Sequence, residues 1–427
     1  MAVPAGPKGT RDFYPEDMAF QQFVFSKWQK TCERYGFESY DGPMFEHLEV
    51  YTQKSGDEIE HQLYAFEDKG QRKIALRPEL TPTLARMVAA KGNALKRPLR
   101  WYSIPRLFRY ERAQKGRLRE FYQLNMDILG IETVDADAEL IASVIGMMID
   151  LGFDSNDFKV RVSSRTLLEE LFSQGGLAKE QFGAVYALLD RKNKITEEAF
   201  NDDMKTIVQD SAVREKISAM FNAQSLDQII AIVGKTPSVE TLHQLFQLLD
   251  AYGYKEYVVF DINIVRGLAY YTGIVFEVFD IKKSMRAIAG GGRYDKLVEL
   301  YGGIPTPAVG FAAGDVVLGD LLKEKGLTPA IPPRSRFFIV YFDDIQRNTV
   351  IALTQQIRNN GQSCEFSLKD SNIGKQLKNA NAARAEYTIF LGGDEGKNGD
   401  VRVKNMVKGD EQVIKLNDLI SYIATLV

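Results

Sequence analysis

The chain changes the period of its hydrophobic pattern twice, and this change constrains the fold more than any other feature. Strand-like segments and helices are mixed through residues 1–165, whereas residues 166–255 form successive charged amphipathic helical patterns with few strand signals. Strand-like segments return in residues 256–325. A helical block between two strand-rich segments is typical of a domain inserted into an antiparallel α+β domain. We therefore predict one α+β domain from the flanking segments and a helical insertion between them.

A Pro-rich stretch, Thr328–Pro333, has the composition of a linker and leads into residues 333–427. Beyond it, strand-like and helical segments alternate, which predicts a small α/β domain. The expected strands are Phe337–Phe342, Cys364–Leu368 and Tyr387–Leu391, and the expected helices are Ile345–Asn359 and Ile373–Ala383. A chain of 427 residues is too long for a single hydrophobic core, which agrees with this division.

The charge balance excludes a protein whose whole surface binds a polyanion. The chain has 54 Lys and Arg against 57 Asp and Glu, so any nucleic-acid partner must meet local basic patches. Two distant cysteines, Cys32 and Cys364, give no disulfide framework and fit a reducing compartment. Scattered histidines predict no His/Cys metal cluster. Because no apolar run is long enough to span a membrane and no signal peptide is visible, we expect a soluble cytoplasmic protein.

A basic hairpin is the first candidate site. Two strand-like segments, Leu99–Glu111 and Leu118–Leu129, flank a short turn, which predicts an antiparallel hairpin. A period of two places the apolar side chains of the second strand on one face. The other face carries Arg119, Phe121, Gln123, Asn125 and Asp127, and Arg109 shares a face with Glu111 in the first strand. Two interpretations remain open: an edge hairpin with one solvated face, or a polar cup with Arg donors for a phosphate and a carboxylate for a cation.

Two shorter signals have structural and functional interpretations. The sequence Leu80-Thr81-Pro82 predicts a helix that begins with a Thr N-cap and a Pro at its first position, and that ends at Gly92. The run Gly290–Gly292, followed by a helix from about Tyr294, is either a simple turn or a place where the backbone approaches a ligand closely.

A series of segments in a fixed order resembles the histidyl-tRNA synthetases, members of the class II aminoacyl-tRNA synthetases. These segments are PKGTRDFYPEDM (Pro7–Met18), LRPELTPTLARM (Leu76–Met87), FRYERAQKGRLREFYQLNMDILG (Phe108–Gly130), RGLAYYTGIVFE (Arg266–Glu277) and AGGGRYD (Ala289–Asp295). Each is modest alone, but their common order is specific. The resemblance implies a class II antiparallel sheet with flanking helices, a helical insertion domain and a C-terminal anticodon-binding α/β domain.

The resemblance also implies an activity and its partners. Such an enzyme activates histidine with ATP and Mg²⁺ to histidyl-adenylate and transfers the histidyl group to tRNA(His). Such an enzyme binds neither DNA nor a membrane. Its side chains hold no metal ion other than the Mg²⁺ that enters with ATP. A homodimer is implied as well, since Glu38–Val50 around Pro43 resembles class II motif 1.

By the same resemblance, site residues are assigned in two groups. Arg109 would grip the α-phosphate, and Arg266 would contact the same phosphate and the substrate carboxylate. Glu111 and Arg117 would also contact ATP, with Arg112 as a further pyrophosphate or tRNA-end contact. The histidine-binding group is Glu79, Thr81, Gln123, Asp127, Tyr270 and Tyr271. Within it, Asp127 and Tyr271 would read the imidazole ring, while Glu79, Thr81 and Gln123 would hold the α-ammonium group; a helix-cap role for Thr81 is an equal competitor.

Two departures from the family pattern keep alternatives open. Ala269 stands where an acidic residue is usual, and Gly314-Asp315-Val316-Val317 stands where the family has Gly-Leu-Glu-Arg. The arginine that normally clamps ATP is thus replaced by Val317, so either another cation, Arg286 or Arg293, takes over or ATP use is weakened.

Weakened use of ATP would be expected of a regulatory paralogue of the family. Such a paralogue binds histidine and an enzyme of histidine biosynthesis but charges no tRNA. Such paralogues usually lack the anticodon-binding domain, which this chain retains. A purely RNA-binding protein fits less well, because Phe337–Val427 offers only a modest basic patch. The members of that patch are Lys375, Lys378, Arg402, Lys404 and Lys408.

Overall fold

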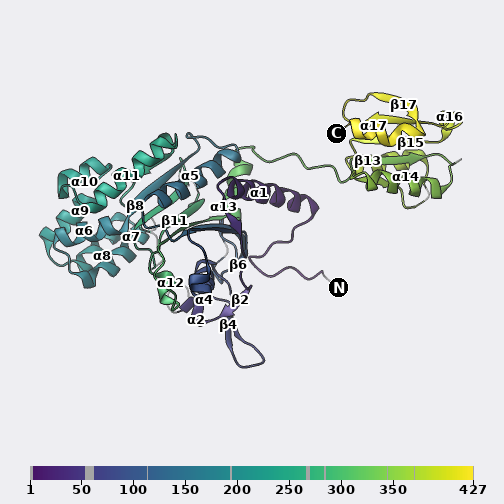
Figure 1. Ribbon diagram of the computed structural model, residues 1–427. Coiled ribbons are helices and arrows are strands. Elements are labelled where there is room, and N and C mark those ends of the chain that lie inside the picture. Colours follow the sequence, from purple (N-terminus) through teal and green to yellow (C-terminus); the bar gives the residue numbers. More distant parts are fainter. Residues whose placement is uncertain are drawn as a thin grey trace. The chain divides into compact units, whose positions relative to one another are not determined.

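The computed structural model describes residues 3–52, 62–112, 114–192, 195–265, 270–282, 285–343, 345–369 and 371–426. The chain forms two compact units, Met1–Pro329 and Ala330–Val427 (Figure 1). The linker predicted at Thr328–Pro333 therefore spans the boundary between them. Among the described residues, no helix combines the length and the apolar character needed to cross a membrane.

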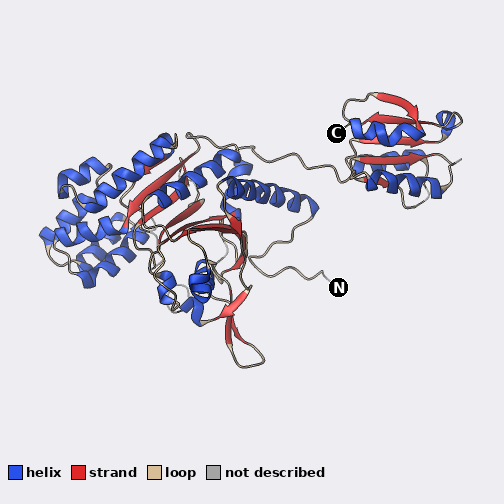
Figure 2. Cartoon of the chain, viewed as in Figure 1, coloured by secondary structure: helices blue, strands red, loops and turns tan. Residues whose placement is uncertain are grey.

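The first unit is built on a large sheet, drawn in red in Figure 2. The sheet has nine strands in the order β1-β5-β7-β12-β11-β10-β8-β9, with β6 paired to β7. The strands are β1 (Glu38–Ser39), β5 (Leu99–Ser103), β6 (Arg106–Phe108), β7 (Glu120–Leu129), β8 (Phe158–Ser164), β9 (Val258–Phe260), β10 (Ile274–Asp280), β11 (Ala289–Arg293) and β12 (Ala308–Gly314). Every pairing from β5 through β8 is antiparallel, whereas β1 and β9 join the edges in parallel. Because strands from both sides of the helical block enter this one sheet, the predicted α+β fold is confirmed.

Helices cover one face of this sheet and bury the apolar side of the hairpin. Helix α1 (Pro15–Arg34) packs on α5 (Asp135–Asp150), and α13 (Asp315–Glu324) packs on β7. The apolar face of β7 (Leu124, Met126 and Ile128) is buried with Trp28 and Ile141 in one core. The alternation predicted for this strand is therefore correct, and its polar side chains must face away from the helices.

Smaller elements lie near the opposite side of the sheet. They are the helices α2 (Glu49–Thr52), α4 (Thr81–Lys91) and α12 (Leu297–Leu300), the 3-10 turn η1 (Gly92–Ala94), and a three-stranded sheet of β2 (Phe45–His47), β4 (Lys73–Leu76) and β3 (Ala65–Glu67). A second core joins Leu84 of α4 to Leu297 and Val298 of α12 and to Tyr270 and Tyr271. This core therefore packs helix α4 beside both tyrosines.

The helical block contains α6 (Arg165–Gly175), η2 (Lys179–Gln181), α7 (Phe182–Arg191), α8 (Glu197–Ile207), α9 (Ser211–Phe221), α10 (Leu226–Val233), α11 (Pro237–Ala251) and η4 (Lys255–Tyr257). Side chains that accept backbone N–H bonds begin many of these helices; they are Ser164, Thr196, Asp210, Ser225 and Thr236. Each such cap stabilises its helix by about 1 kcal/mol. The buried side of the block shares one continuous core with the large sheet, so a boundary between insertion and catalytic parts stays a prediction.

The second unit is an α/β sandwich around a sheet of order β14-β13-β15-β16-β17. Its strands are β13 (Phe337–Tyr341), β14 (Cys364–Phe366), β15 (Tyr387–Leu391), β16 (Asp400–Asn405) and β17 (Glu411–Lys415). Its helices are α14 (Arg347–Asn359), α15 (Ile373–Ala382), α16 (Gly393–Gly396), η5 (Leu416–Asp418) and α17 (Leu419–Thr425). Helices α14 and α17 share one core with the sheet, and α15 contributes to another. The sequence predicted β13, β14, β15, α14 and α15 but missed β16 and β17, in which most residues are polar.

Three local predictions are wrong. Of the two interpretations of Gly290–Gly292, the simple turn is wrong, since these residues lie inside β11. Close contact between strands therefore requires glycine at positions 291 and 292, where a Cβ would stand 2.2 Å and 2.6 Å from backbone oxygens of the neighbouring strands. The other interpretation, a close approach of this backbone to a ligand, stays a prediction. The helix cap is also misplaced: Leu80 holds the N-cap position, Thr81 is the first helical residue, and Pro82 is the second. The first hairpin strand is likewise interrupted between β5 and β6, where Pro105 has no N–H to donate.

The close approach at Gly291 predicts a stability effect. We expect Gly291→Ala to lower the free energy of unfolding by about 3 kcal/mol, because the new methyl group meets rigid backbone on β12. Gly183→Ala is the matched control, since a Cβ there meets nothing within 4 Å. Urea denaturation measures both variants, and an unchanged midpoint for Gly291→Ala would contradict the strand packing.

Candidate active site

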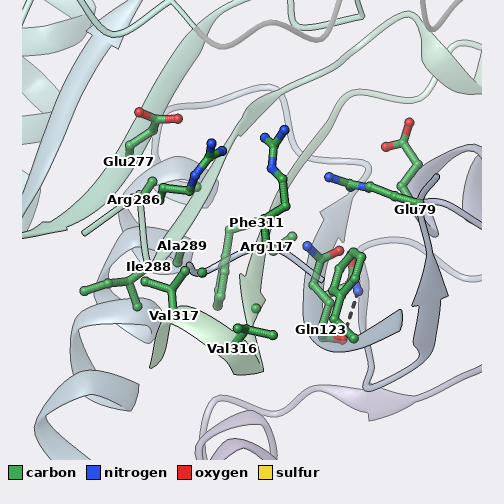
Figure 3. A pocket seen from close by; sticks show the side chains of 18 of the residues that line it. Glu79, Arg117, Gln123, Glu277, Arg286, Ile288, Ala289, Phe311, Val316 and Val317 are labelled. Atoms are coloured by element: carbon green, nitrogen blue, oxygen red, sulfur yellow. Dashed lines mark hydrogen bonds between the residues drawn. The ribbon is translucent and has the colours of Figure 1, made fainter. Parts of the chain in front are cut away.

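A cavity of about 670 Å³ opens on the polar side of β7 (Figure 3). It collects side chains from α4, the hairpin, β10, β11, β12 and the start of α13. Nearly all the predicted site residues line it: Glu79, Thr81, Arg109, Glu111, Arg117, Gln123, Asp127, Tyr270 and Tyr271. Arg266 and Ala269 lie outside the described residues. The polar face of the hairpin is thus the wall of a cavity and not a solvated edge.

One end of the cavity is buried and built around Asp127. Asp127 is only 3% exposed and accepts a hydrogen bond of 2.5 Å from the Tyr294 hydroxyl. Burial raises the pKa of Asp127 to about 7, although the bond from Tyr294 acts in the opposite direction. Gly310 lies opposite Asp127 in the strand register, and a Cβ there would stand 1.9 Å from a carboxylate oxygen. A side chain at position 310 would therefore displace Asp127.

A second buried carboxylate lies beside this end. The Tyr270 hydroxyl donates to Glu79 Oε2 at 2.9 Å, and Thr81 lies within reach of the same hydroxyl. Burial, with Glu79 nearby, raises the pKa of Tyr270, so the phenol stays protonated. The rings of Tyr270 and Tyr271 are 5.0 Å apart. Buried acceptors and phenol donors in this arrangement suit a small ligand with cationic and hydrogen-bonding groups.

The other end of the cavity is cationic. Arg109 donates from Nε to the Pro78 carbonyl at 2.9 Å and lies 5.3 Å from the Phe121 ring centroid, so its guanidinium is held in place. Burial lowers the pKa of Arg109, and Glu79 and Glu111 oppose that shift. Arg117 forms a 2.5 Å ion pair with Glu111. This end can therefore receive an anion with preorganised donors.

Of the two arginines expected to replace the missing cation, only Arg286 faces the cavity. Arg293 does not line it; instead it forms a buried ion pair with Asp137 and donates to the carbonyls of Ile131 and Thr133. Removing Arg293 from this network would leave a buried carboxylate unpaired. Arg293 is thus a structural residue, and its proposed role at the nucleotide end is wrong. Arg112 is exposed and also lies outside the cavity lining.

Two features of the site escaped the sequence. Tyr294 belongs to the AGGGRYD segment, but nothing in the sequence indicated that its hydroxyl would form a hydrogen bond to Asp127. Asp315, which is part of the Gly-Asp-Val-Val departure, is buried and pairs with Arg11 at 2.7 Å. It also accepts a hydrogen bond from the Tyr122 backbone N–H at 3.0 Å. The Gly-Asp-Val-Val sequence therefore lacks the arginine of the family but provides Asp315, which links the N-terminal segment to the hairpin.

In the second unit, the expected basic patch is partly neutralised. Glu411 pairs with Lys404 at 2.7 Å and with Arg402 at 3.4 Å. The patch therefore offers less positive charge than its residue count suggests.

Comparison with known proteins covers nearly the whole chain. A family model described as histidyl-tRNA synthetase matches residues 9–315, and one described as anticodon binding domain matches residues 336–426. A histidine–tRNA ligase of Opitutus terrae is 41% identical over 94% of this chain and 94% of its own length. A chloroplastic/mitochondrial histidine–tRNA ligase of Arabidopsis thaliana is 40% identical over 97% of this chain and 85% of its own length.

Solved structures share the fold at lower sequence identity. A histidyl-tRNA synthetase from Nostoc sp. PCC 7120 superposes with a TM-score of 0.85 at 23% identity and covers 100% of both chains. A structure from Bacillus halodurans C, titled an ATP phosphoribosyltransferase regulatory subunit/histidyl-tRNA synthetase, has a TM-score of 0.74 at 23% identity. It covers 89% of this chain and 98% of its own.

Proposed function

The chain belongs to the histidyl-tRNA synthetase family, and on this premise we propose how its cavity charges tRNA(His) with histidine. The enzyme is an ATP-dependent aminoacyl-tRNA ligase. The histidine carboxylate attacks the α-phosphate of ATP, pyrophosphate leaves, and the histidyl group then passes from the adenylate to tRNA. The observation that carries the proposal is one cavity whose lining combines the buried carboxylates Asp127 and Glu79 with the arginines Arg109 and Arg117.

The buried end would bind histidine. In this proposal Asp127 accepts a hydrogen bond from one ring nitrogen of the imidazole, with Tyr294 fixing the carboxylate, and Tyr271 faces the other ring nitrogen. Glu79, Thr81 and Gln123 hold the α-ammonium group, and Tyr270 orients Glu79 through their hydrogen bond. A site that pairs both ring nitrogens rejects amino acids that lack them, because buried polar groups would then be left unpaired.

The cationic end would carry out the activation step. Two anions, a carboxylate and a phosphate, must approach each other, so charge stabilisation matters more than a nucleophile or a base. We assign Arg109 to the α-phosphate, with Arg117 and Glu111 on the rest of the nucleotide. Arg266 would join them by resemblance.

Mg²⁺ would enter with ATP. No cluster of three or more His, Cys, Asp or Glu side chains suited to a metal lies among the described residues. Mg²⁺ often needs only one or two carboxylates besides the phosphates, and Glu111 and Glu277 line the cavity. We propose that these carboxylates assist an ion held mainly by ATP, which neutralises charge on the phosphates. A cytoplasmic location is also part of the proposal, supported by two buried free cysteines.

The non-charging regulatory subunit remains a weaker second candidate. Its support is Val317 in the cavity wall where the family has a nucleotide-binding arginine. Against it, residues 336–426 match an anticodon binding domain. A regulatory subunit that charges no tRNA would not require such a domain.

Histidine-dependent exchange of pyrophosphate into ATP tests the proposal, with other amino acids as controls. Exchange with histidine alone, followed by charging of tRNA(His), is expected. Histidine binding without exchange would favour the regulatory subunit.

A homodimer completes the proposal. Apolar side chains are exposed around the three-stranded sheet; they are Met44, Phe45, Phe66 and Tyr110. Phe45, at 55% exposed, lies in the segment that resembles motif 1. An apolar group of this kind suits a self-complementary contact between two copies.

We therefore expect Phe45→Glu to convert the dimer into a monomer, because two carboxylates would be buried at one contact. Light scattering after size exclusion measures this change, with Val413→Glu on the second unit as an exposed apolar control. A stable wild-type monomer would exclude the dimer.

A further inference from the structure

The cavity lining contains one more arginine, Arg286, beyond those that the resemblance assigns to ATP. Arg286 lies between β10 and β11 and lines the cavity with an exposed side chain, and Figure 3 shows it near Arg117 and Glu277. Val316 and Val317, from the start of α13, form the apolar wall below it. The side of the cavity that α13 leaves without a cation is therefore supplied with one from a different loop.

Arg286 has no close ion-pair partner among the described residues. Arg117 forms a 2.5 Å ion pair with Glu111, whereas Glu111 acts on Arg286 only through its charge, and Glu277 lines the same cavity. Burial lowers the pKa of Arg286, and the neighbouring Arg117 lowers it further, while Glu111 acts against both. Two guanidinium groups that repel each other at one cavity wall are stabilised when a multivalent anion lies between them.

Gly116, in the hairpin turn, lies close to both Val317 and Arg286. Gly116 has a φ of +74°, and a Cβ there would lie 3.2 Å from Val317 Cγ2 and 3.9 Å from Arg286 Cδ. The hairpin turn, α13 and the Arg286 loop therefore meet at one point. Because valine is small, the turn packs closely against α13, and the aliphatic part of Arg286 lies near the same glycine.

We propose that Arg286 is a nucleotide-binding residue that, with Arg117, binds the polyphosphate of ATP and supplies the charge that Val317 lacks. This inference rests on the proposed function of the cavity. It assigns to Arg286 the pyrophosphate portion and not the histidine end, because the charged groups that act on Arg286 are Arg117 and Glu111, whereas Asp127 and Glu79 are not among them.

A charge series at position 286 tests the proposal on the full-length enzyme. Steady-state pyrophosphate exchange is measured for Arg286→Lys, Arg286→Ala and Arg286→Glu. We expect Arg286→Ala to raise the KM for ATP and for pyrophosphate about tenfold to a hundredfold, since it removes charged hydrogen bonds. The KM values of Arg286→Lys for ATP and pyrophosphate should lie between those of wild type and Arg286→Ala. Those of Arg286→Glu should exceed those of Arg286→Ala. The KM for histidine should stay unchanged.

Lys282→Ala is the matched control. Lys282 lies in the same loop, is exposed, and does not line the cavity, so its loss removes one positive charge without touching the proposed contact. Its KM values should equal those of wild type. An equal effect of both alanine variants, or a pyrophosphate KM unaffected by charge at position 286, would overturn the assignment. Absence of exchange in the wild type would instead contradict the function of the cavity itself.

Discussion

Arg109→Ala is expected to slow formation of histidyl-adenylate by about a thousandfold, because the cavity loses a donor aimed at the α-phosphate. The guanidinium is held by the Pro78 carbonyl and the Phe121 ring before substrate arrives, so wild type spends little energy on reorganisation. Its stabilisation should be greatest in the transition state, where negative charge builds on the phosphate. The loss should therefore appear in kcat for pyrophosphate exchange more than in the KM for histidine.

The companion variant Arg109→Lys separates charge from geometry. Lysine keeps a positive charge but has neither the planar fork nor the ring contact, so it should recover only a small part of the rate. Arg191→Ala, which breaks an exposed ion pair with Asp203 in the helical block, should leave the rate unchanged. Single-turnover adenylate formation measures all three variants. A lysine variant as fast as wild type would mean that Arg109 acts only as a diffuse charge.

The hairpin shows how much of this site local sequence can predict. Alternation alone placed Gln123, Asn125 and Asp127 on one face, because a half-buried strand forces apolar residues to the other. The inserted helical block was visible for the same reason, since its apolar period differs from that of the flanking strands. Predictions of this kind depend on neighbours in sequence, and they were confirmed in β7 and in α6 through α11.

Contacts between distant segments were not predictable in this way. The ion pair of Arg11 with Asp315 joins residues 304 positions apart, and the bond of Tyr294 to Asp127 spans 167 positions. Arg293 illustrates the opposite error: its charge suggested a phosphate contact, whereas the fold places it against buried Asp137. Residue type alone does not decide between a ligand contact and an internal ion pair, because both use the same chemistry.

Asp127 carries the other large expected effect. We expect Asp127→Ala to lower kcat/KM for histidine by about a thousandfold, because the imidazole loses a buried acceptor and the Tyr294 hydroxyl loses its partner. Tyr294→Phe removes only the supporting hydrogen bond, so about a tenfold loss is expected. The two effects should not add in the double variant, since the contribution of Tyr294 acts through Asp127.

The raised pKa of Asp127 adds a pH signature to this prediction. Burial raises the pKa of Asp127 to about 7, so its carboxyl becomes increasingly neutral as pH falls below that value. The imidazole of free histidine gains its own proton near pH ~6.5, and two protonated groups then face each other. The KM for histidine should therefore rise steeply below pH ~6 in wild type. In Asp127→Asn it should follow the protonation of histidine alone, since asparagine cannot titrate. Exchange assays between pH ~5.5 and ~8 distinguish the two profiles, and parallel profiles would show that Asp127 does not contact the ring.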